Sequence, residues 1–375
     1  MNKFEILKRD PETKARYGIL KTHHYKVETP NFMPVATQGA VKMLAPRELE
    51  EIGVEIIVCN TYHLMLRPGS GLIKKFGGLH RFIGWDRAIL TDSGGFQAYS
   101  LGDLRKVSDD GLDFSSHLDG SKHFLSPELA INIQAELAPD IAMCLDFFTP
   151  YPSQFLETRL AVERTVNWAK RSIAIKKKPY LFGIIQGATF KNLRRECTRR
   201  IVELDFPGFG IGGLMIGEPA TLTNEMVSEV NQVIPEKRVR YLMGCGYPED
   251  IVEAVSFGVD LFDCVLPTRN GRTGMAFTSE GKVIIKSSRY AADKSPLDTK
   301  CSCYTCQNFS RAYLRHLFNA GEALAGKLVS YHNIHFYINL MAMIRASIKK
   351  GNYQNFKKKI LKNFNFRNSQ PSHFE

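Results

Sequence analysis

The segment VDLFDCVLPTRNGRTG, residues 259–274, joins an apolar run that ends in a carboxylate to a basic stretch that contains glycine. We expect a strand that ends at Asp263, and we expect a loop to follow it because Pro267 cannot extend a central strand. In parallel α/β barrels the active site is built at the carboxyl ends of the strands, so Asp263 is the candidate nucleophile. Taken alone, the same residue could cap a turn and leave Arg269 and Arg272 in solvent.

Seven further apolar runs have the same form, because each ends abruptly in a polar residue or a glycine. The eight runs are Pro34–Thr37, Ile56–Asn60, Ala88–Asp92, Ile141–Asp146, Phe182–Gln186, Phe209–Gly213, Tyr241–Gly244 and Leu261–Asp263. Helical periodicity predicts helices in most of the gaps, at Pro46–Ile52, Pro127–Leu137, Glu157–Lys176, Leu193–Glu203, Glu218–Val233 and Pro248–Phe257. Apolar strands that alternate with helices are typical of a parallel sheet covered on both faces. Eight such units predict an α/β fold, a (β/α)8 TIM barrel.

Two further observations concern how this barrel is built. An open doubly wound sheet is the alternative within the same class, but no glycine fingerprint opens a helix after the first strand. The segment 96–126 is rich in Asp, Gly and Ser and does not fit a minimal strand–helix unit. We expect it to be an insertion over the mouth of the barrel, where it could act as a substrate lid.

The residues that end the strands of a barrel face one site. This set contains carboxylates, amides, a serine and glycine backbone: Asn60, Asp92, Ser93, Asp146, Gln186, Gly213, Gly244 and Asp263. Carboxylates and amides can pair with the ring N–H and carbonyl groups of a flat heterocycle. Two carboxylates can also serve glycosidic-bond chemistry, in which one attacks the anomeric carbon and another moves protons. The alternative, a metal-dependent barrel hydrolase, usually adds strand-end histidines, and only His63 lies close to a predicted strand end.

The eight cysteines fall into two groups. Five are scattered, mostly in apolar runs, and we expect them to be reduced core residues: Cys59, Cys144, Cys197, Cys245 and Cys264. The other three place three thiolates within six residues: Cys301, Cys303 and Cys306. Such spacing predicts a closed structural zinc site. The spacing leaves the fourth ligand open among His332, His335 and His316.

The formal charge of +12 concerns the partners of the protein rather than its fold. No acidic residue occurs between Glu322 and Glu375. The basic residues there include Arg345, Lys349, Lys350, Lys357, Lys358, Lys359, Lys362 and Arg367. A polyanion such as RNA suits this end of the chain, although a solvated helical face would have the same composition. No segment resembles a signal peptide or approaches the ~20 apolar residues of a membrane span, so we expect a globular protein of the cytoplasm.

Six motifs are informative together: Thr91–Gln97 (TDSGGFQ), Phe182–Gly187 (FGIIQG), Gly212–Leu214, Tyr241–Gly244 (YLMG), Leu261–Arg272, and the Cys-x-Cys-x-x-Cys set with its histidine. They resemble bacterial tRNA-guanine transglycosylase, the queuine tRNA-ribosyltransferase, over residues 4–347. The resemblance implies a barrel, which we place at residues 1–270, and a zinc-binding, tRNA-contacting C-terminal subdomain at 271–375, usually in a homodimer. The implied reaction exchanges the wobble guanine of GUN-anticodon tRNAs (Asp, Asn, His and Tyr) for a 7-deazaguanine. It needs neither ATP nor a redox cofactor.

The resemblance also implies roles for single residues. Asp263 would attack the ribose anomeric carbon, and Asp92 would be the general acid and base that deprotonates the incoming base. The implied contacts of the base and its ribose are Asp146, Gln186, Gly213, Leu214, Phe96, Met243, Asn60 and Ser93, with Phe96 and Met243 on either side of the rings. Arg269 and Arg272 would read neighbouring uridines of the anticodon loop. The ligands of one structural zinc ion would be Cys301, Cys303, Cys306 and His332.

Two departures from the bacterial pattern concern the base pocket. Phe147 and Phe148 stand where that pattern has an acidic residue and then a cysteine, and Met215 and Ile216 replace a smaller Ala-Val pair. Bulkier apolar side chains would change the surroundings of the 7-substituent. Either 7-aminomethyl-7-deazaguanine or queuine, taken up ready-made, is therefore the expected base.

Two rival interpretations remain at this point. A non-catalytic tRNA-binding subunit of a related heterodimer would keep the barrel and the zinc site but could lose the aspartates, whereas Asp92 and Asp263 are both present. A metal-dependent hydrolase would need a metal ion at the strand ends, in addition to the zinc ion of the cysteine cluster.

Overall fold

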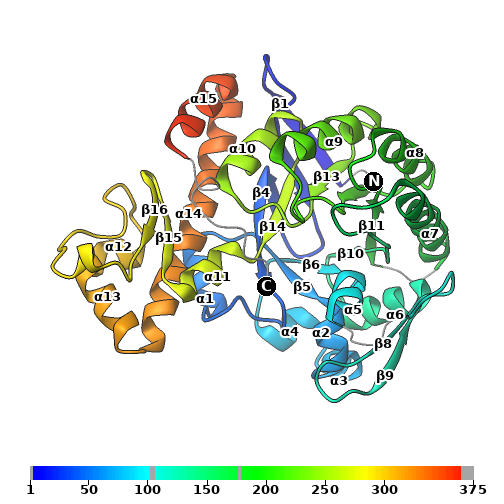
Figure 1. Cartoon of the computed structure of the whole chain (residues 1–375), viewed down its shortest axis with the longest axis horizontal. Helices are drawn as coiled ribbons and strands as arrows, with labels where there is room; N and C mark the ends of the chain where they lie inside the picture. Colours follow the sequence, from blue (N-terminus) through cyan, green and yellow to red (C-terminus); the bar gives the residue numbers. More distant parts are fainter. Residues whose placement is uncertain (1–2, 102–105, 176–178, 365–375) are drawn as a thin grey trace.

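The structure, a computed structural model, describes residues 3–101, 106–175 and 179–364. Its centre is a closed barrel of parallel strands in the order β4, β5, β6, β10, β11, β12, β13 and β14, in which β14 pairs back onto β4 (Figure 1). The predicted (β/α)8 barrel is confirmed. Lys176 at the end of a predicted helix, residues 102–105 of the expected insertion and Arg367 of the basic segment lie outside the described residues.

All eight predicted apolar runs fall on barrel strands. The strands are β4 (Asn31–Ala36), β5 (Ile56–Asn60), β6 (Ala88–Asp92), β10 (Ile141–Met143), β11 (Tyr180–Ile185), β12 (Gly208–Ile211), β13 (Val239–Leu242) and β14 (Leu261–Cys264). Every residue of β5, β12 and β13 is buried, because the barrel interior covers one face of each strand and the outer helices cover the other. The register pairs Asn60 with Asp92, so these two strand ends lie at the same level.

Helices lie around the outside of the barrel (Figure 1). The predicted helices are present with small differences at their ends: α1 (Pro46–Ile52), α6 (Pro127–Leu137), α7 (Phe155–Ile173), α8 (Lys191–Val202), α9 (Ala220–Val233) and α10 (Pro248–Ser256). Proline lies in the first turn of α1, α6 and α10, where the helix does not use an N–H group. Periodicity does not predict the short helices between β5 and β6, because they span fewer residues than the pattern needs: α2 (Thr61–Leu66), α3 (Ser70–Lys75) and α4 (Leu79–Ile83).

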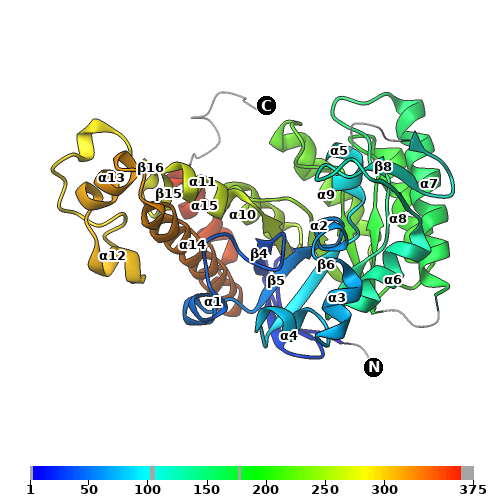
Figure 2. The same ribbon diagram turned by 90° about the horizontal axis from the view of Figure 1, so that it is seen from below.

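Two small antiparallel sheets lie at opposite ends of the barrel. The N-terminal sheet consists of β1 (Phe4–Arg9), β2 (Arg16–Lys21) and β3 (Lys26–Thr29), which the sequence reading did not predict. The expected insertion contains α5 (Gly95–Leu101), β7 (Lys106–Val107), β8 (Leu112–Ser115) and β9 (Lys122–Leu125). Figure 2 shows α5 and β8 on the side of the barrel away from the N-terminus. The insertion therefore lies at the end where the strands finish, and its role as a lid stays a prediction.

The chain after the barrel forms a second group of elements on one side of it (Figure 1). These are β15 (Met275–Thr278), β16 (Gly281–Ile284), the 3-10 helix η1 (Ser288–Tyr290), α12 (Tyr304–Asn308), α13 (Arg311–Asn319), α14 (Ala323–Lys349) and α15 (Tyr353–Asn363). The long helix α14 connects this group to the barrel. Its Arg345 donates a hydrogen bond to the carbonyl of Pro30 at 2.9 Å, and its Tyr337 hydroxyl bonds the carbonyl of Gly246.

The expectation of a loop after β14 is wrong, because residues 266–273 form helix α11 (Leu266–Thr273). Pro267 lies in its first turn, and Gly274, with a φ of 95°, ends it in the left-handed conformation. Gly271 is needed for close packing: a Cβ there would lie 2.5 Å from the Ser330 Oγ of α14. Glycine is unfavourable inside a helix, and the close contact with α14 compensates for its presence in α11. The domain boundary expected at residue 270 falls inside α11, and a division there stays a prediction.

The other general expectations concern membranes and thiols. Within the described residues, no helix is long and apolar enough to span a membrane. The five scattered cysteines are free thiols; Cys264 is half-buried, and the buried ones are Cys59, Cys144, Cys197 and Cys245. The prediction of reduced core cysteines agrees with these positions.

Candidate active site and metal centre

Asp263, the candidate nucleophile, lies near the carboxyl end of β14. Its Oδ1 accepts hydrogen bonds from the Tyr241 hydroxyl at 2.7 Å and from the Gly244 amide at 2.8 Å. Burial raises the pKa of Asp263, and these two donors oppose the shift because they stabilise the ionised form. Both donors bind the same oxygen, so they orient the carboxylate. Its Oδ2 has no hydrogen-bond partner among the described residues.

Asp92 ends β6 and lies in a different environment. Its Oδ2 accepts a hydrogen bond from Asn60 Nδ2 at 2.7 Å, and its Oδ1 accepts from the amides of Thr61 and Gly94, each at 3.1 Å. Burial raises the pKa of Asp92 to about 7; the Thr61 amide opposes this shift, and the negative charge of Asp263 adds to it. A carboxyl group that titrates near neutrality can both accept and donate a proton at physiological pH.

Asp146 and Gln186 form a hydrogen-bonded pair at neighbouring strand ends. Gln186 Nε2 donates to Asp146 Oδ2 at 2.6 Å. Burial raises the pKa of Asp146 to about 6, while the hydrogen bonds from Gln186 and Ser93 lower it. Gln186 also lies against Gly213, where a Cβ would come within 2.2 Å of Gln186 Oε1. The structure therefore brings together the carboxylate, the amide and the glycine backbone that the sequence singles out.

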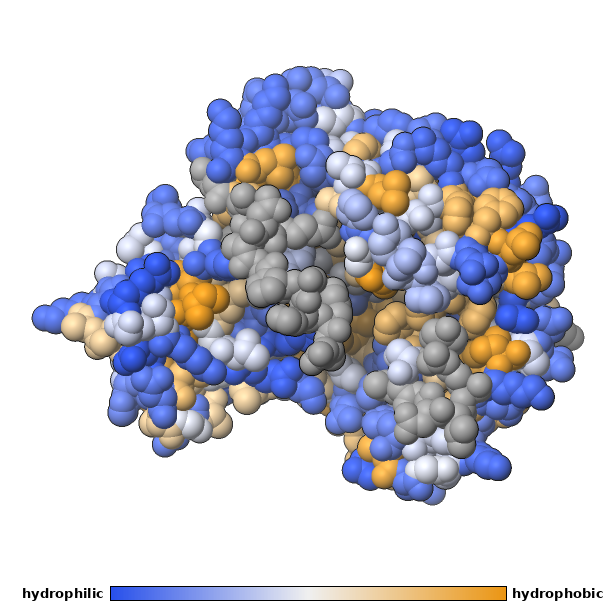
Figure 3. Space-filling model, in the orientation of Figure 1, coloured by the Kyte–Doolittle hydropathy of each residue, from blue (hydrophilic) through white to orange (hydrophobic). Residues whose placement is uncertain are grey.

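Aromatic and apolar residues lie beside these polar groups. Phe96 of α5 is 47% exposed, and its ring stacks on that of Phe148 with centroids 4.8 Å apart. Phe147 packs in another direction, against Trp168 of α7 and under the guanidinium of Arg164. Of the two departures next to Asp146, only Phe148 reaches Phe96. Seen from the side of Figure 1, the surface is hollowed near the middle of the barrel, and apolar residues lie in the hollow (Figure 3).

The remaining predicted base contacts also lie at strand ends. Leu214 is buried after β12, and Met243 is half-buried after β13. Met243 Sδ lies 3.1 Å from the position that a Cβ of Gly210 would occupy, so a small residue on β12 makes room for it.

Arg269 and Arg272, the predicted RNA contacts, are exposed on α11, the helix that follows Asp263 directly. Asn333 of α14 holds this helix in place, because its Nδ2 donates to the carbonyl of Pro267 at 2.9 Å. The arginines are thus carried by a helix that is anchored on one side to the catalytic strand and on the other to α14.

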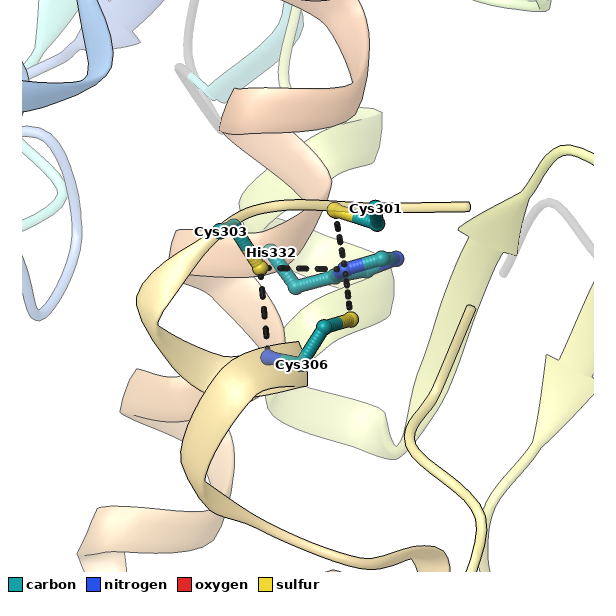
Figure 4. Close-up of side chains that lie close together, drawn as sticks. All are labelled: Cys301, Cys303, Cys306 and His332. Carbon is teal, nitrogen blue, oxygen red and sulfur yellow. Dashed lines mark hydrogen bonds between the residues drawn. The ribbon is translucent and has the colours of Figure 1, made fainter. Parts of the chain in front are cut away.

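The three clustered cysteines meet one histidine of α14, as Figure 4 shows. The four donor atoms of Cys301, Cys303, Cys306 and His332 lie within 4.8 Å of one another. His332 Nδ1 lies 3.7, 3.5 and 3.2 Å from the Sγ atoms of Cys301, Cys303 and Cys306 respectively. A tetrahedral zinc ion with Zn–S of about 2.3 Å and Zn–N of about 2.0 Å places its nitrogen and sulfur ligands roughly 3.5 Å apart. The donor set therefore fits one zinc ion.

The surroundings of the cluster define the role of His332. Its Nε2 lies 2.8 Å from the carbonyl oxygen of Phe277, so Nε2 carries the proton and Nδ1 keeps its lone pair for a metal. His335 Nδ1 lies 3.5 Å from Cys301 Sγ, but among the described residues the metal-binding group contains His332 and neither His335 nor His316.

Sequence reasoning missed three polar residues that support the site: Tyr241, Arg194 and Glu218. The sequence pattern predicts for Tyr241 only a place in an apolar strand, whereas its hydroxyl donates a hydrogen bond to Asp263. Glu218 accepts hydrogen bonds from the amides of Met215 and Ile216, at 2.6 and 3.1 Å, and so fixes the loop after β12. A signal for Arg194 is its position three residues before the buried Cys197, because a charged residue on the apolar face of a helix requires buried partners.

The closed barrel and the cysteine–histidine cluster define the class: a (β/α)8-barrel protein with an appended metal-binding part. The family model described as "Queuine tRNA-ribosyltransferase" matches residues 10–365. A curated queuine tRNA-ribosyltransferase from Caldanaerobacter subterraneus subsp. tengcongensis is 53% identical over 365 residues, which cover 96% of this chain and 97% of the relative. The corresponding proteins of Thermoanaerobacter pseudethanolicus and Desulforudis audaxviator are 51% and 50% identical over 368 and 361 residues, covering 97% and 96% of this chain and 98% and 97% of theirs. The chain therefore belongs to the queuine tRNA-ribosyltransferase family.

This result confirms the resemblance found in the sequence. Proteins of this family are pentosyltransferases, so the chain is an enzyme of that class rather than a barrel hydrolase.

Proposed function

We propose that this protein exchanges the wobble guanine of GUN-anticodon tRNAs (Asp, Asn, His and Tyr) for a 7-deazaguanine, in the formation of queuosine. The relatives bear the name queuine tRNA-ribosyltransferase, which supports tRNA and a deazaguanine as the substrates. The observation that carries the mechanism is the contrast between two strand-end carboxylates: Asp263 is oriented by two donors on one oxygen, whereas Asp92 titrates near neutrality.

In the proposed mechanism, an oxygen of Asp263 forms a bond to the ribose anomeric carbon while the bond from that carbon to guanine breaks. The electron pair of the broken bond leaves with guanine, which takes up a proton from the Asp92 carboxyl and leaves it ionised. The incoming base gives a proton to Asp92, and its ring nitrogen attacks the anomeric carbon and releases Asp263. One glycosidic bond replaces another through a covalent ribosyl-aspartate, so no ATP is required.

The proposed base contacts are those that the family resemblance implies. The Asp146 carboxylate accepts from ring and amino N–H groups of the base, Gln186 and the Gly213–Leu214 backbone contact its other edge, and Phe96 and Met243 lie on its two faces. Asn60 contacts the ribose, and Ser93 supports Asp146. Three observations support these assignments: the hydrogen bond from Gln186 to Asp146, the hydrogen bond from Ser93 to Asp146, and the close approach of Gln186 to Gly213.

The remaining parts of the proposal concern RNA, metal and assembly. Arg269 and Arg272 lie exposed on α11 and suit the uridines beside the exchanged base. One structural zinc ion is held by Cys301, Cys303, Cys306 and His332. We further propose a homodimer that acts on tRNA in the cytoplasm.

The identity of the base depends on the residues that differ from the bacterial pattern. Phe148 offers an aromatic surface beside Phe96 and no charge for a compact ammonium group. Such a surface suits the cyclopentene ring of queuine, which makes queuine a competitor of 7-aminomethyl-7-deazaguanine. Met215 and Ile216 follow Leu214 in the loop fixed by Glu218.

The reaction is tested by incubating the protein with unmodified tRNA(Tyr) and radiolabelled guanine, without ATP, and analysing the RNA on a denaturing gel. Label enters the RNA if the proposal is correct. Asp263→Asn keeps the fold and tRNA binding but gives no incorporation, and Asp92→Asn slows incorporation strongly. Incorporation by Asp263→Asn at the wild-type rate would identify a different nucleophile. Wild-type protein that is folded, holds zinc and yet incorporates no label would contradict the proposed reaction.

The base is tested by comparing kcat/KM for queuine and 7-aminomethyl-7-deazaguanine with one tRNA. We expect Phe148→Cys to shift the preference toward the aminomethyl base. Phe147→Leu is the matched control, because Phe147 packs against Trp168 and not against Phe96. A strong wild-type preference for the aminomethyl base would refute the role given to Phe148.

A further inference from the structure

Arg194 is a fully buried arginine on α8 whose hydrogen bonds all go to main-chain carbonyl oxygens. Its Nε donates to Ala188 at 2.7 Å, and its Nη1 donates to Ile185 at 3.1 Å. Nη1 also donates to Gly212 at 2.8 Å, and Nη2 to Gly213 at 3.1 Å. One guanidinium therefore joins the loop after β11, which carries Gln186, to the loop after β12.

These contacts fix the direction of two amides. The C=O and N–H groups of a trans peptide point in opposite directions. Since the carbonyls of Gly212 and Gly213 both point at Arg194, the N–H groups of Gly213 and Leu214 both point away from it. Gly213 has a φ of 62°, the left-handed conformation that lets consecutive N–H groups converge. Helix α8 lies on the outside of the barrel (Figure 1), so N–H groups that point away from Arg194 point away from this helix.

The neighbouring amides are used elsewhere. Glu218, which is buried, accepts from the N–H groups of Met215 and Ile216. Among the described residues, the N–H groups of Gly213 and Leu214 have no hydrogen-bond partner. Gln186, paired with Asp146, lies directly against Gly213. Two converging, unpaired donors thus lie next to the carboxylate and amide of the proposed base pocket.

We propose that Arg194 is a positioning residue: it holds the Gly213 and Leu214 amides as a pair of donors for the carbonyl oxygen of the purine base. This inference rests on the base exchange proposed above. When the bond from the ribose to guanine breaks, the electron pair left on the ring is delocalised onto this carbonyl oxygen. Donors already aimed at the oxygen stabilise that charge without rearrangement.

The chemistry of arginine is required for this arrangement. A guanidinium presents five N–H donors in a rigid plane, whereas a lysine ammonium is a compact group that cannot reach carbonyls on two loops at once. Burial lowers the pKa of Arg194 to about 10, so the group stays charged at neutral pH and polarises the peptides it binds.

The test measures binding of guanine and of 6-thioguanine by the wild type, Arg194→Lys and Arg194→Met. In 6-thioguanine, sulfur replaces the carbonyl oxygen and accepts hydrogen bonds weakly, but the ring N–H and amino groups that face Asp146 remain. We expect the wild type to bind guanine about tenfold or more tightly than 6-thioguanine, and both variants to lose most of that difference. The rate of the chemical step should fall more than the affinity for tRNA.

Arg240→Lys is the matched control, because Arg240 is also buried and also donates to carbonyl oxygens, but at the start of β13, the other end of the strand from Gly244. It should keep the wild-type preference for guanine even if it lowers Tm as much as Arg194→Lys does. If folded Arg194 variants keep the full preference for guanine over 6-thioguanine, the positioning role is wrong. If the wild type itself binds neither base and exchanges none, the proposed function fails instead.

Discussion

Replacing Asn60 by alanine should move the pH dependence of base exchange. Asn60 Nδ2 donates to Asp92 Oδ2 at 2.7 Å and favours the ionised carboxylate. A hydrogen bond to a charged group contributes about 1.5–3 kcal/mol, and 1.36 kcal/mol corresponds to one pKa unit, so its loss raises the pKa of Asp92 by about one unit or more. Water that enters the vacated space replaces part of the lost hydrogen bond, so the expected rise of the Asp92 pKa is about one unit.

The direction of the effect follows from the role of Asp92 as a base. At limiting base, kcat/KM reports the step in which the incoming base gives a proton to the ionised Asp92 carboxylate, so kcat/KM of the wild type should rise with pH through the Asp92 pKa of about 7. With the pKa raised to about 8, only about one tenth of the variant is ionised at pH 7, compared with about one half of the wild type. Loss of the proposed ribose contact lowers kcat/KM of Asn60→Ala equally at every pH. Relative to the wild type, we therefore expect kcat/KM of the variant to be about fivefold lower at pH 7 than at pH 9.

The assay is label exchange at limiting base concentration from pH 5.5 to 9. Asn60 also caps α2, because its Oδ1 accepts from the His63 amide at 3.0 Å. Asn60→Ser separates the two roles, since serine is a good helix cap but cannot reach Asp92. Both variants should show the same shift although their stabilities differ. A midpoint that stays at the wild-type pH, or moves to lower pH, would show that Asp92 is not the group that titrates.

Three further changes have defined outcomes. Cys306→Ser should lose the bound zinc measured by atomic absorption and lower Tm, whereas Cys264→Ser, outside the cluster, should keep one zinc per chain. Tyr241→Phe removes one of the two donors to Asp263 and should lower kcat by about tenfold with little change in KM for tRNA, which steady-state kinetics will show. Asp140→Asn should lower the free energy of unfolding by about 3–5 kcal/mol in urea titrations, because the buried Asp140 carboxylate accepts several hydrogen bonds. Burial raises the pKa of Asp140, but hydrogen bonds from His80, the Ile89 amide and His24 hold it well below its usual range, so the stabilisation is present above about pH 4 and lost as the pH falls further.

The fold follows from local patterns to a large extent. The apolar runs and helical periods along the chain predict the barrel because strands that are buried on both faces must be apolar throughout. The cysteine spacing predicts the metal centre for a similar reason, since three ligands lie within one short segment. The strand-end residues Asp92, Asp146 and Asp263 could also be found from the sequence, because each one closes an apolar run.

Other features depend on contacts between distant segments. The sequence could not decide that residues 266–273 are helical, because Gly271 is compatible with a helix only where α14 packs against it. It could not choose among the histidines that follow the cysteines, because the direction of His332 depends on how α14 lies against β15. The sequence also could not show that Asp92 and Asp263 lie in different environments, because their hydrogen-bond partners belong to other segments of the chain.

The class of fold and the list of reactive groups can therefore be predicted from the sequence, since both depend on residue type and on spacing along the chain. Tertiary structure alone decided which carboxylate titrates near neutrality, which of Phe147 and Phe148 faces Phe96, and which carbonyls Arg194 binds. The physical reason is that pKa values and hydrogen-bond directions depend on burial and on partners that lie far away in the sequence.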